Sequence, residues 1–147
     1  MATVDLSYKN LNNQKRMTNA SVAWLEFNLG GGVTITSGDS FITCGIPKEA
    51  LITSIFTEVE VAFNAGTTAV MNIGNAGSAT AYATGVNINA ATSGSPISTT
   101  AGKYVDAGDT IILTPSWTGT APTTGRVKVI FEYIETATLA GEYNTVV

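Results

Sequence analysis

Short runs of alternating apolar and polar residues constrain the fold of this 147-residue chain more than any other feature. The clearest run is residues 51–63, LITSIFTEVEVAF, in which apolar side chains recur at odd positions, with Thr53 and Thr57 between them, and the even positions include Ser54, Glu58 and Glu60. A period of two places successive side chains on opposite faces of a β-strand. We therefore predict a strand here, with one face on the core and the other toward solvent or a partner. The side chains expected to face the core are Leu51, Ile55, Val59, Val61 and Phe63.

Several other segments repeat this pattern between clusters of Gly, Asn, Asp, Ser and Pro. In residues 126–135, RVKVIFEYIE, one face carries Val127, Val129, Phe131 and Tyr133, and the other carries Lys128 and Glu132 together with the apolar Ile130 and Ile134. Residues 110–119, TIILTPSWTG, place Ile111, Leu113 and Trp117 on one face, with Pro115 between them. Because proline cannot donate to a ladder of hydrogen bonds, we expect an edge strand or a bulge at Pro115. About eight to ten short strands with regular turn signals are typical of a sandwich or jelly roll. We predict an all-β fold, a single antiparallel β-sandwich or jelly-roll-like domain with an extended N-terminal arm.

The composition divides the chain into three parts. Residues 1–20 are polar and Asn-rich, and they hold three of the seven basic side chains. We interpret them as an N-terminal arm, residues 21–135 as the sandwich domain and residues 136–147 as a short C-terminal tail.

The charge balance excludes some classes of partner. Charged residues make up only 12% of the chain, and its net charge is −4. Nucleic-acid binding requires a basic face, so we expect no nucleic-acid partner. No apolar run reaches 18 residues, and the N-terminus lacks the apolar stretch of a secretory signal. We therefore expect the protein to be synthesised in a cytoplasm and not to associate with a membrane.

The residues needed for most enzymatic chemistry are missing. The sequence contains no histidine and one cysteine, Cys44, which alternates with apolar neighbours and is interpreted as a core thiol. Without histidine, the Ser-His-Asp triad, the Cys-His pair and most zinc sites are excluded. We expect no catalytic residue, no cofactor and no metal, and predict that the chain is not an enzyme.

Two carboxylate pairs are candidate exceptions to this exclusion of enzymatic and metal-binding sites. Glu58 and Glu60 share a strand face at a spacing of roughly 6.6 Å, within the range of a glycosidase pair. Any two alternate strand positions give this spacing, so a solvated or subunit-facing pair is the favoured interpretation. Asp106 and Asp109, in DAGDT, offer oxygen ligands for calcium. Stabilisation of a turn by their side chains explains them more simply.

Aromatic side chains suggest either a sugar platform or a protein contact. The candidates are Trp24, Tyr82, Tyr104 and Trp117. Trp117 shares its parity with Ile111 and Leu113, which favours the core. Trp24 has the opposite parity to Leu25, which places it under the arm, in a subunit contact or on a sugar-binding surface. A subunit contact is favoured over a sugar site because aromatic anchors dominate protein interfaces.

Two long stretches resemble small virion proteins of tailed bacteriophages. They are residues 46–79, IPKEALITSIFTEVEVAFNAGTTAVMNIGNAGSA, and residues 101–135, AGKYVDAGDTIILTPSWTGTAPTTGRVKVIFEYIE. The shared features are a proline-containing loop, a strand ending in AFN-GTT, the motif Y-DAGDTI and the motif GTAPT-GRV. The resemblance covers residues 46–135 and consists of turn and core signatures.

The resemblance implies a decoration or cement protein on the capsid surface of a virion, often a homotrimer. Its partner would be the major capsid protein, and its role would be to stabilise the capsid by bridging neighbouring subunits. The alternative is a receptor- or carbohydrate-binding domain of a phage fibre, spike or tail component. The residues we expect at an interface are Leu6, Tyr8, Lys9, Leu11, Lys15, Arg16, Trp24, Glu58 and Glu60. In the arm, the apolar members would anchor the segment and the basic members would meet an acidic surface of the shell.

Overall fold

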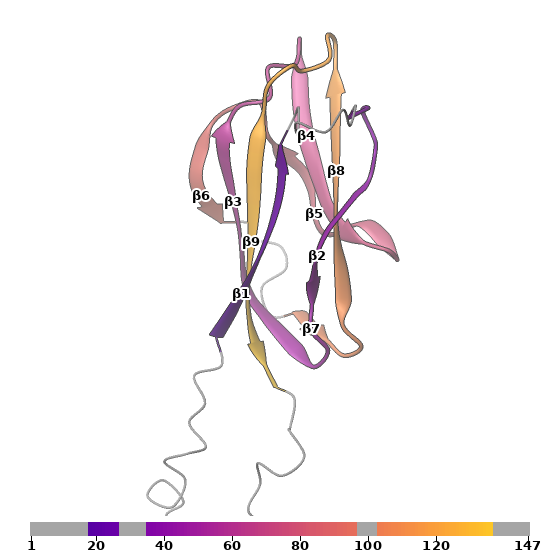
Figure 1. The fold of residues 1–147 in the computed structure, drawn as a ribbon, viewed down its shortest axis with the longest axis vertical. Coiled ribbons are helices and arrows are strands. Elements are labelled where there is room, and N and C mark those ends of the chain that lie inside the picture. The colour runs from indigo at the N-terminus through magenta and orange to yellow at the C-terminus, as the bar shows by residue number, and fades with distance from the viewer. Residues whose placement is uncertain (1–17, 27–34, 97–102, 137–147) are drawn as a thin grey trace, which may run out of the picture.

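A computed structural model describes residues 18–26, 35–96 and 103–136, with the backbone alone at residues 18–24, 26 and 93–96. These residues form strands and connecting loops (Figure 1). They contain no helix long and apolar enough to cross a membrane. The strands are β1 (Thr18–Glu26), β2 (Phe41–Ile46), β3 (Ala50–Val61), β4 (Thr68–Asn75), β5 (Ser78–Asn87), β6 (Thr92–Pro96), β7 (Lys103–Val105), β8 (Asp109–Thr118) and β9 (Arg126–Glu135).

Two antiparallel sheets pack against each other. The first, sheet A, has the order β1-β9-β3-β6, and β7 pairs with the opposite end of β3 from β6. The second, sheet B, has the order β2-β8-β4-β5. Apart from the β4–β5 hairpin and the step from β6 to β7, each strand is followed by one in the other sheet. This winding is that of a jelly roll. The predicted all-β sandwich is therefore confirmed.

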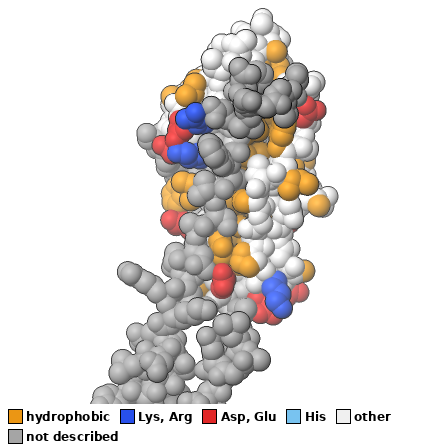
Figure 2. Space-filling view, in the orientation of Figure 1, with side chains coloured by type: hydrophobic (Ala, Val, Ile, Leu, Met, Phe, Trp, Pro, Cys, Tyr) orange, Lys and Arg blue, Asp and Glu red, His pale blue; other side chains and the backbone are white. Residues whose placement is uncertain are grey.

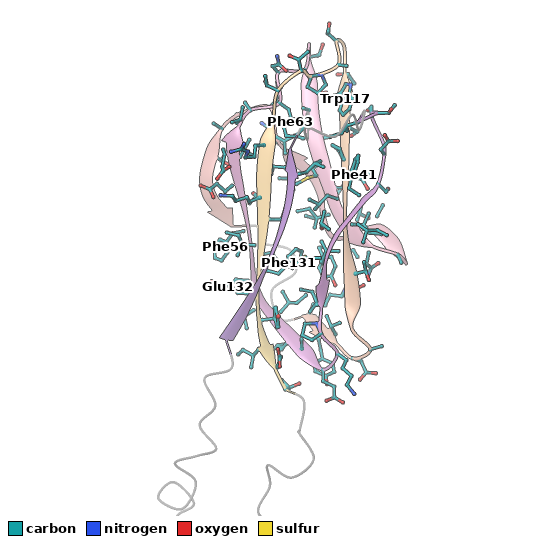
Figure 3. The ribbon with its side chains drawn as sticks, in the orientation of Figure 1. Phe41, Phe56, Phe63, Trp117, Phe131 and Glu132 are labelled. Atoms are coloured by element: carbon teal, nitrogen blue, oxygen red, sulfur yellow. The ribbon has the colours of Figure 1, made fainter. Side chains whose placement is uncertain are left out.

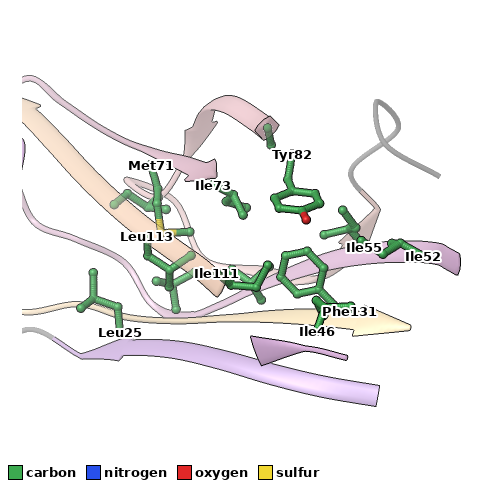
Figure 4. Close-up of a cluster of buried hydrophobic side chains, with 14 of the residues drawn as sticks. Leu25, Ile46, Ile52, Ile55, Met71, Ile73, Tyr82, Ile111, Leu113 and Phe131 are labelled. Carbon is green, nitrogen blue, oxygen red and sulfur yellow. The ribbon is translucent and has the colours of Figure 1, made fainter. Parts of the chain in front are cut away.

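The core lies between the sheets and is apolar. Phe131 of β9 and Tyr82 of β5 meet edge to face across it, with ring centroids 5.4 Å apart (Figure 4). Strict alternation holds along β9, as expected. Its buried members are Val127, Val129, Phe131 and Tyr133.

Strand β3 departs from the predicted alternation at two β-bulges. The first lies between Ile52 and Ser54, and it makes Ile52 a buried residue while Leu51 is only half-buried. The second lies between Val59 and Val61, and Val61 is 44% exposed. An extra residue in one strand shifts the faces on which the following side chains lie. The predicted core positions Leu51 and Val61 were therefore wrong, whereas Ile55, Val59 and Phe63 are buried as predicted.

The prediction of an edge strand at Pro115 was also wrong. Strand β8 lies inside sheet B, between β2 and β4. Its register with β4 continues through Pro115 without a shift. On the other side, β2 begins opposite Leu113, and a loop lies beyond it, in which the Gly38 amide donates to the Pro115 carbonyl at 2.8 Å. Proline is tolerated there because the missing amide points to a place where no strand needs a donor.

The two ends of the described domain lie side by side. The β1–β9 register pairs Thr18 with Ile134, so β1 begins where β9 ends. Residues 1–17 and 137–147, which include most of the predicted arm and tail, lie outside the described residues. Both segments are therefore attached to the same end of sheet A.

Candidate functional site

The predicted interface residues that the structure describes lie on sheet A. Glu58 and Glu60 belong to β3, and Trp24, described by its backbone, pairs with Lys128 of β9. Lys128 pairs in turn with Glu58. The register therefore aligns Trp24, Lys128 and Glu58 across three neighbouring strands. The remaining predicted residues, Leu6, Tyr8, Lys9, Leu11, Lys15 and Arg16, lie outside the described residues.

Four charged side chains form a cluster on this sheet, which we call the charged quartet: Glu58, Glu60, Arg126 and Lys128. The Lys128 ammonium donates a hydrogen bond to Glu60 and lies 3.8 Å from Glu58 Oε2. Arg126 Nη1 lies 3.6 Å from Glu60 Oε2. In Figure 2 these charges gather over β3 and β9, beside mostly uncharged surface. The prediction that both carboxylates share one face is confirmed by their common contact with Lys128.

A β-bulge places Glu60 within reach of both bases. Val59 pairs with Val127 and Val61 with Arg126, which leaves Glu60 as the extra residue of β3. Bulges commonly redirect a side chain in this way. The sequence showed the two acids but not their partners, because pairing with β9 depends on the strand order.

Contact between Lys128 and Glu60 favours the ionised form of both side chains. The hydrogen bond from Lys128 lowers the pKa of Glu60 below its ordinary value, assisted by the charges of Lys128 and Arg126. The same hydrogen bond raises the pKa of Lys128 above its ordinary value. Glu60 thus stays charged as the pH falls to its lowered pKa, and Lys128 as the pH rises to its raised pKa. Exposed pairs of this kind add little stability and are weakened by salt. The quartet is therefore better suited to recognising charges on a partner than to holding the fold.

Half-buried apolar side chains lie on the same outer face. Phe56 of β3 pairs with Ile130 of β9, and Leu51 pairs with Ile134. Figure 3 shows Phe56 and Glu132 on the outer side of this sheet, whereas Phe131 points between the sheets. Apolar positions next to paired charges are the usual composition of a protein interface. The unusual apolar residues on the outer parity of β9 were visible in the sequence, but Phe56 was not recognised.

An open groove of about 550 Å³ adjoins the quartet. Its lining is Glu58, Val59, Glu60, Ala91, Thr92 and Arg126. The Thr92 hydroxyl accepts a hydrogen bond from the Val59 amide at 3.3 Å, which holds the groove wall to β3. The groove is polar and shallow, a shape that suits an extended segment or another protein surface better than a small substrate.

The other candidate carboxylates belong to turns and to the core. Asp109, at the start of β8, accepts hydrogen bonds from Tyr82 and from Asn75 Nδ2, the latter at 2.7 Å. Asp106 is exposed, and its backbone carbonyl accepts a hydrogen bond from the Glu49 amide at 3.2 Å. The described residues contain no group of three or more side chains able to hold a metal ion. The contact between Asp109 and Tyr82 was not predicted from the sequence. It depends on how the β4–β5 hairpin lies beside β8, which no local pattern shows.

The core thiol prediction holds in part. Cys44 is half-buried and packs against the core, and burial raises the pKa of its thiol. A raised pKa leaves less of the reactive thiolate at neutral pH.

Among the side chains that the structure describes, Tyr82, Tyr104 and Trp117 do not converge on a sugar platform. Tyr82 is buried in the core, and Trp117 packs against it. Tyr104 is 51% exposed but belongs to β7, which pairs with the start of β3, whereas Trp117 pairs with Ala69 near the start of β4. Figure 1 places these regions toward opposite ends of the sandwich.

Comparison with known proteins points to phage capsids. No protein-family model and no curated protein sequence matches the chain. A chain in the capsid asymmetric unit of cyanophage Pam1 is similar in structure, with a TM-score of 0.60 and 26% identity over 82% of this chain and 87% of that one. A chain in the acid-stable capsid of Helicobacter pylori bacteriophage KHP30 shares the fold, with a TM-score of 0.56 and 10% identity over 82% of this chain and 90% of that one.

Proposed function

We propose that the chain is a structural, non-enzymatic protein of a tailed-phage virion that decorates the capsid surface as a cement subunit. The observation that carries this proposal is the likeness to a chain of the cyanophage Pam1 capsid, in fold and at 26% identity. The sequence resemblance to small virion proteins points the same way. The absence of histidine removes the commonest catalytic base and agrees with a structural role.

The physical role would be to raise the cost of separating neighbouring subunits of the major capsid protein. A bridging protein does this by adding interface area to both subunits. The outer face of sheet A offers apolar contact at Phe56 and Ile130, and charge recognition through the quartet. The polar arm would add a second contact by ordering on the neighbouring surface.

The first experiment is localisation of the chain in purified particles. We expect mass spectrometry to find it in many copies per capsid, and cryo-electron microscopy to find its jelly roll on the outside of the shell. A position in the tail or fibre would contradict the cement role, and an array of glycans would then test the receptor-binding alternative. A cement protein should bind none of the glycans. The homotrimer implied by the resemblance remains a prediction for the solution mass.

Deletion of residues 1–16 is expected to abolish binding to capsids that lack the protein. The arm holds Lys9, Lys15 and Arg16 and the apolar residues proposed as its anchors. The deletion ends before β1 begins at Thr18, so the truncated protein should keep its thermal transition. Binding is measured by co-sedimentation with capsids, and a variant with Lys48→Ala, on the folded domain, serves as the control. Unchanged occupancy of the truncated protein would reject the role of the arm.

A further inference from the structure

We propose that contact with the capsid shell is anchored by one apolar row at the end of sheet A where both terminal segments attach. The row consists of Tyr104 in β7, Leu51 in β3 and Ile134 in β9, and we call it the terminal row. The inference rests on the proposed function. It goes beyond that function by naming the anchor, Tyr104, and the surface that the anchor requires, an apolar pocket on the shell.

The strand register brings the three side chains of the terminal row together. Leu51 pairs with Tyr104 on one side and with Ile134 on the other. Val105 and Tyr133, the chain neighbours of Tyr104 and Ile134, are buried between the sheets, so the row has the outward parity. Figure 1 places β7, the start of β3 and the end of β9 at one end of the sandwich. The row therefore lies on the outer face of sheet A, at that end.

Tyr104 is the exposed member of the row. It is 51% exposed, whereas Leu51 and Ile134 are half-buried beside it. Tyrosine is enriched among the residues that dominate binding energy, because its ring buries a large area at a low cost in side-chain entropy. Phe56 and its pair Ile130 continue the apolar surface along the same sheet. Tyr104 thus has the chemistry of an anchor, with apolar neighbours to complete the contact.

Hydrogen bonds fix this end of the sandwich before any partner binds. The amide and the hydroxyl of Thr136 both donate to the Glu49 carbonyl, at 2.7 and 2.6 Å. The Glu49 amide donates in turn to the Asp106 carbonyl at 3.2 Å. These bonds join the start of β3, the turn after β7 and the end of β9, which are the strands of the terminal row. An anchor on a frame that is already ordered loses little entropy when it binds.

Chain connectivity identifies the shell as the surface that covers the row. Strand β1 begins at Thr18, which pairs with Ile134. Lys15 precedes Thr18 by three residues, and a chain spans at most about 3.6 Å per residue, so the Cα atoms of Lys15 and Arg16 stay within about 11 Å of that of Thr18. A shell surface bound by these bases of the arm therefore lies next to the terminal row.

The quartet lies beyond this reach. Glu26, at the other end of β1, pairs with Arg126 of the quartet. The length of β1 separates that pair from Thr18 by roughly 25 Å, at about 3.3 Å per residue. The terminal row is thus the part of sheet A that a shell surface held by the arm contacts first, and the quartet adds charge recognition farther along the sheet.

The two contacts at this end require different chemistry from the shell. The terminal row carries no charged side chain and requires an apolar pocket, whereas Lys15 and Arg16 require acids beside that pocket. Apolar burial is proportional to the area removed from water, while exposed charge pairs are screened by salt. Salt therefore separates the contribution of Tyr104 from that of the arm.

The test is co-sedimentation of full-length variants with capsids that lack the protein. Tyr104→Ala should weaken binding by about tenfold or more, a loss typical of a truncated aromatic anchor. Tyr104→Phe keeps the ring and should bind within about threefold of the wild type. Ile42→Ala is the control, because it truncates a side chain that is 76% exposed on sheet B, and it should leave binding unchanged. Circular dichroism checks that each variant folds.

Salt provides the second measurement. Both the wild type and Tyr104→Ala should bind more weakly as salt rises from about 0.05 M to about 0.3 M, because the bases of the arm are screened. The ratio of their affinities should persist, because the contact of the ring is apolar. A ratio that disappears at the higher salt concentration would contradict an apolar pocket.

Three other outcomes would overturn the inference and leave the proposed function standing. The first is binding of Tyr104→Ala within about twofold of the wild type. The second is an equal loss for Tyr104→Ala and Ile42→Ala. The third is a fall in the solution mass of Tyr104→Ala, which would place the terminal row against another copy of the chain. Failure of the wild-type chain itself to bind capsids would overturn the proposed function, and this inference with it.

Discussion

Replacement of Phe131 by Ala is expected to lower the free energy of unfolding by about 3–5 kcal/mol. The Phe131 side chain is fully buried and bridges the two sheets through its edge-to-face contact with Tyr82. Its removal forfeits the transfer energy of the ring and leaves a cavity that two sheets, held by their ladders, cannot close. Urea denaturation followed by far-ultraviolet circular dichroism measures the loss.

Phe56→Ala is the matched control, because the same side chain is truncated on the outer face. Phe56 is half-buried, and its loss should cost at most about 1.5 kcal/mol. The same variant should weaken capsid binding if sheet A contacts the shell. Equal losses of stability for the two variants would contradict the assignment of inner and outer faces to β9 and β3.

The sequence predicted most of the strands and, for most of them, which side chains face the core. Both properties depend on the local pattern of apolar and polar residues. Alternation along residues 126–135 identified β9 and its buried face without error. The turn predicted at Asp106–Asp109 separates β7 from β8, as expected. In such segments, side-chain parity and turn residues are sufficient, since a strand needs only one apolar face to bind the core.

The errors arose where a distant strand decides the local geometry. The bulges in β3 are defined by its register with β9. The sequence of β3 alone does not indicate where these extra residues lie, so the exposure of Val61 could not be predicted from it. Pro115 was misjudged because its tolerance depends on where β2 begins. For the candidate site, the acids were found and their basic partners were missed for the same reason. Strand order is a property of the whole chain, so Glu58 and Glu60 could not be assigned to Lys128 from spacing.

Asp109→Ala is expected to lower the free energy of unfolding by about 1.5–3 kcal/mol, a range typical of hydrogen bonds to charged groups. Its carboxylate links three elements by accepting from Tyr82 in β5, from Asn75 at the end of β4 and from its neighbour Thr110 at 2.9 Å. Burial, assisted by this carboxylate, raises the pKa of Tyr82, which extends to higher pH the range in which the phenol donates to Asp109. Lys103 Nζ, 4.1 Å from the centre of the Tyr82 ring, adds a cation–π contact from β7.

A double-mutant cycle with Tyr82→Phe separates this bond from the rest of the packing. Because the phenol loses its Asp109 acceptor in the first variant, Tyr82→Phe should cost less in the Asp109→Ala background, with a coupling energy of about 0.5–3 kcal/mol. Asp106→Ala, three residues away in the same turn, removes an exposed carboxylate and should change stability by less than about 0.5 kcal/mol. Additive losses in the cycle would show that Asp109 acts on the turn alone. Equal losses at Asp106 and Asp109, with a melting temperature raised by calcium, would instead support the calcium site that the sequence left open.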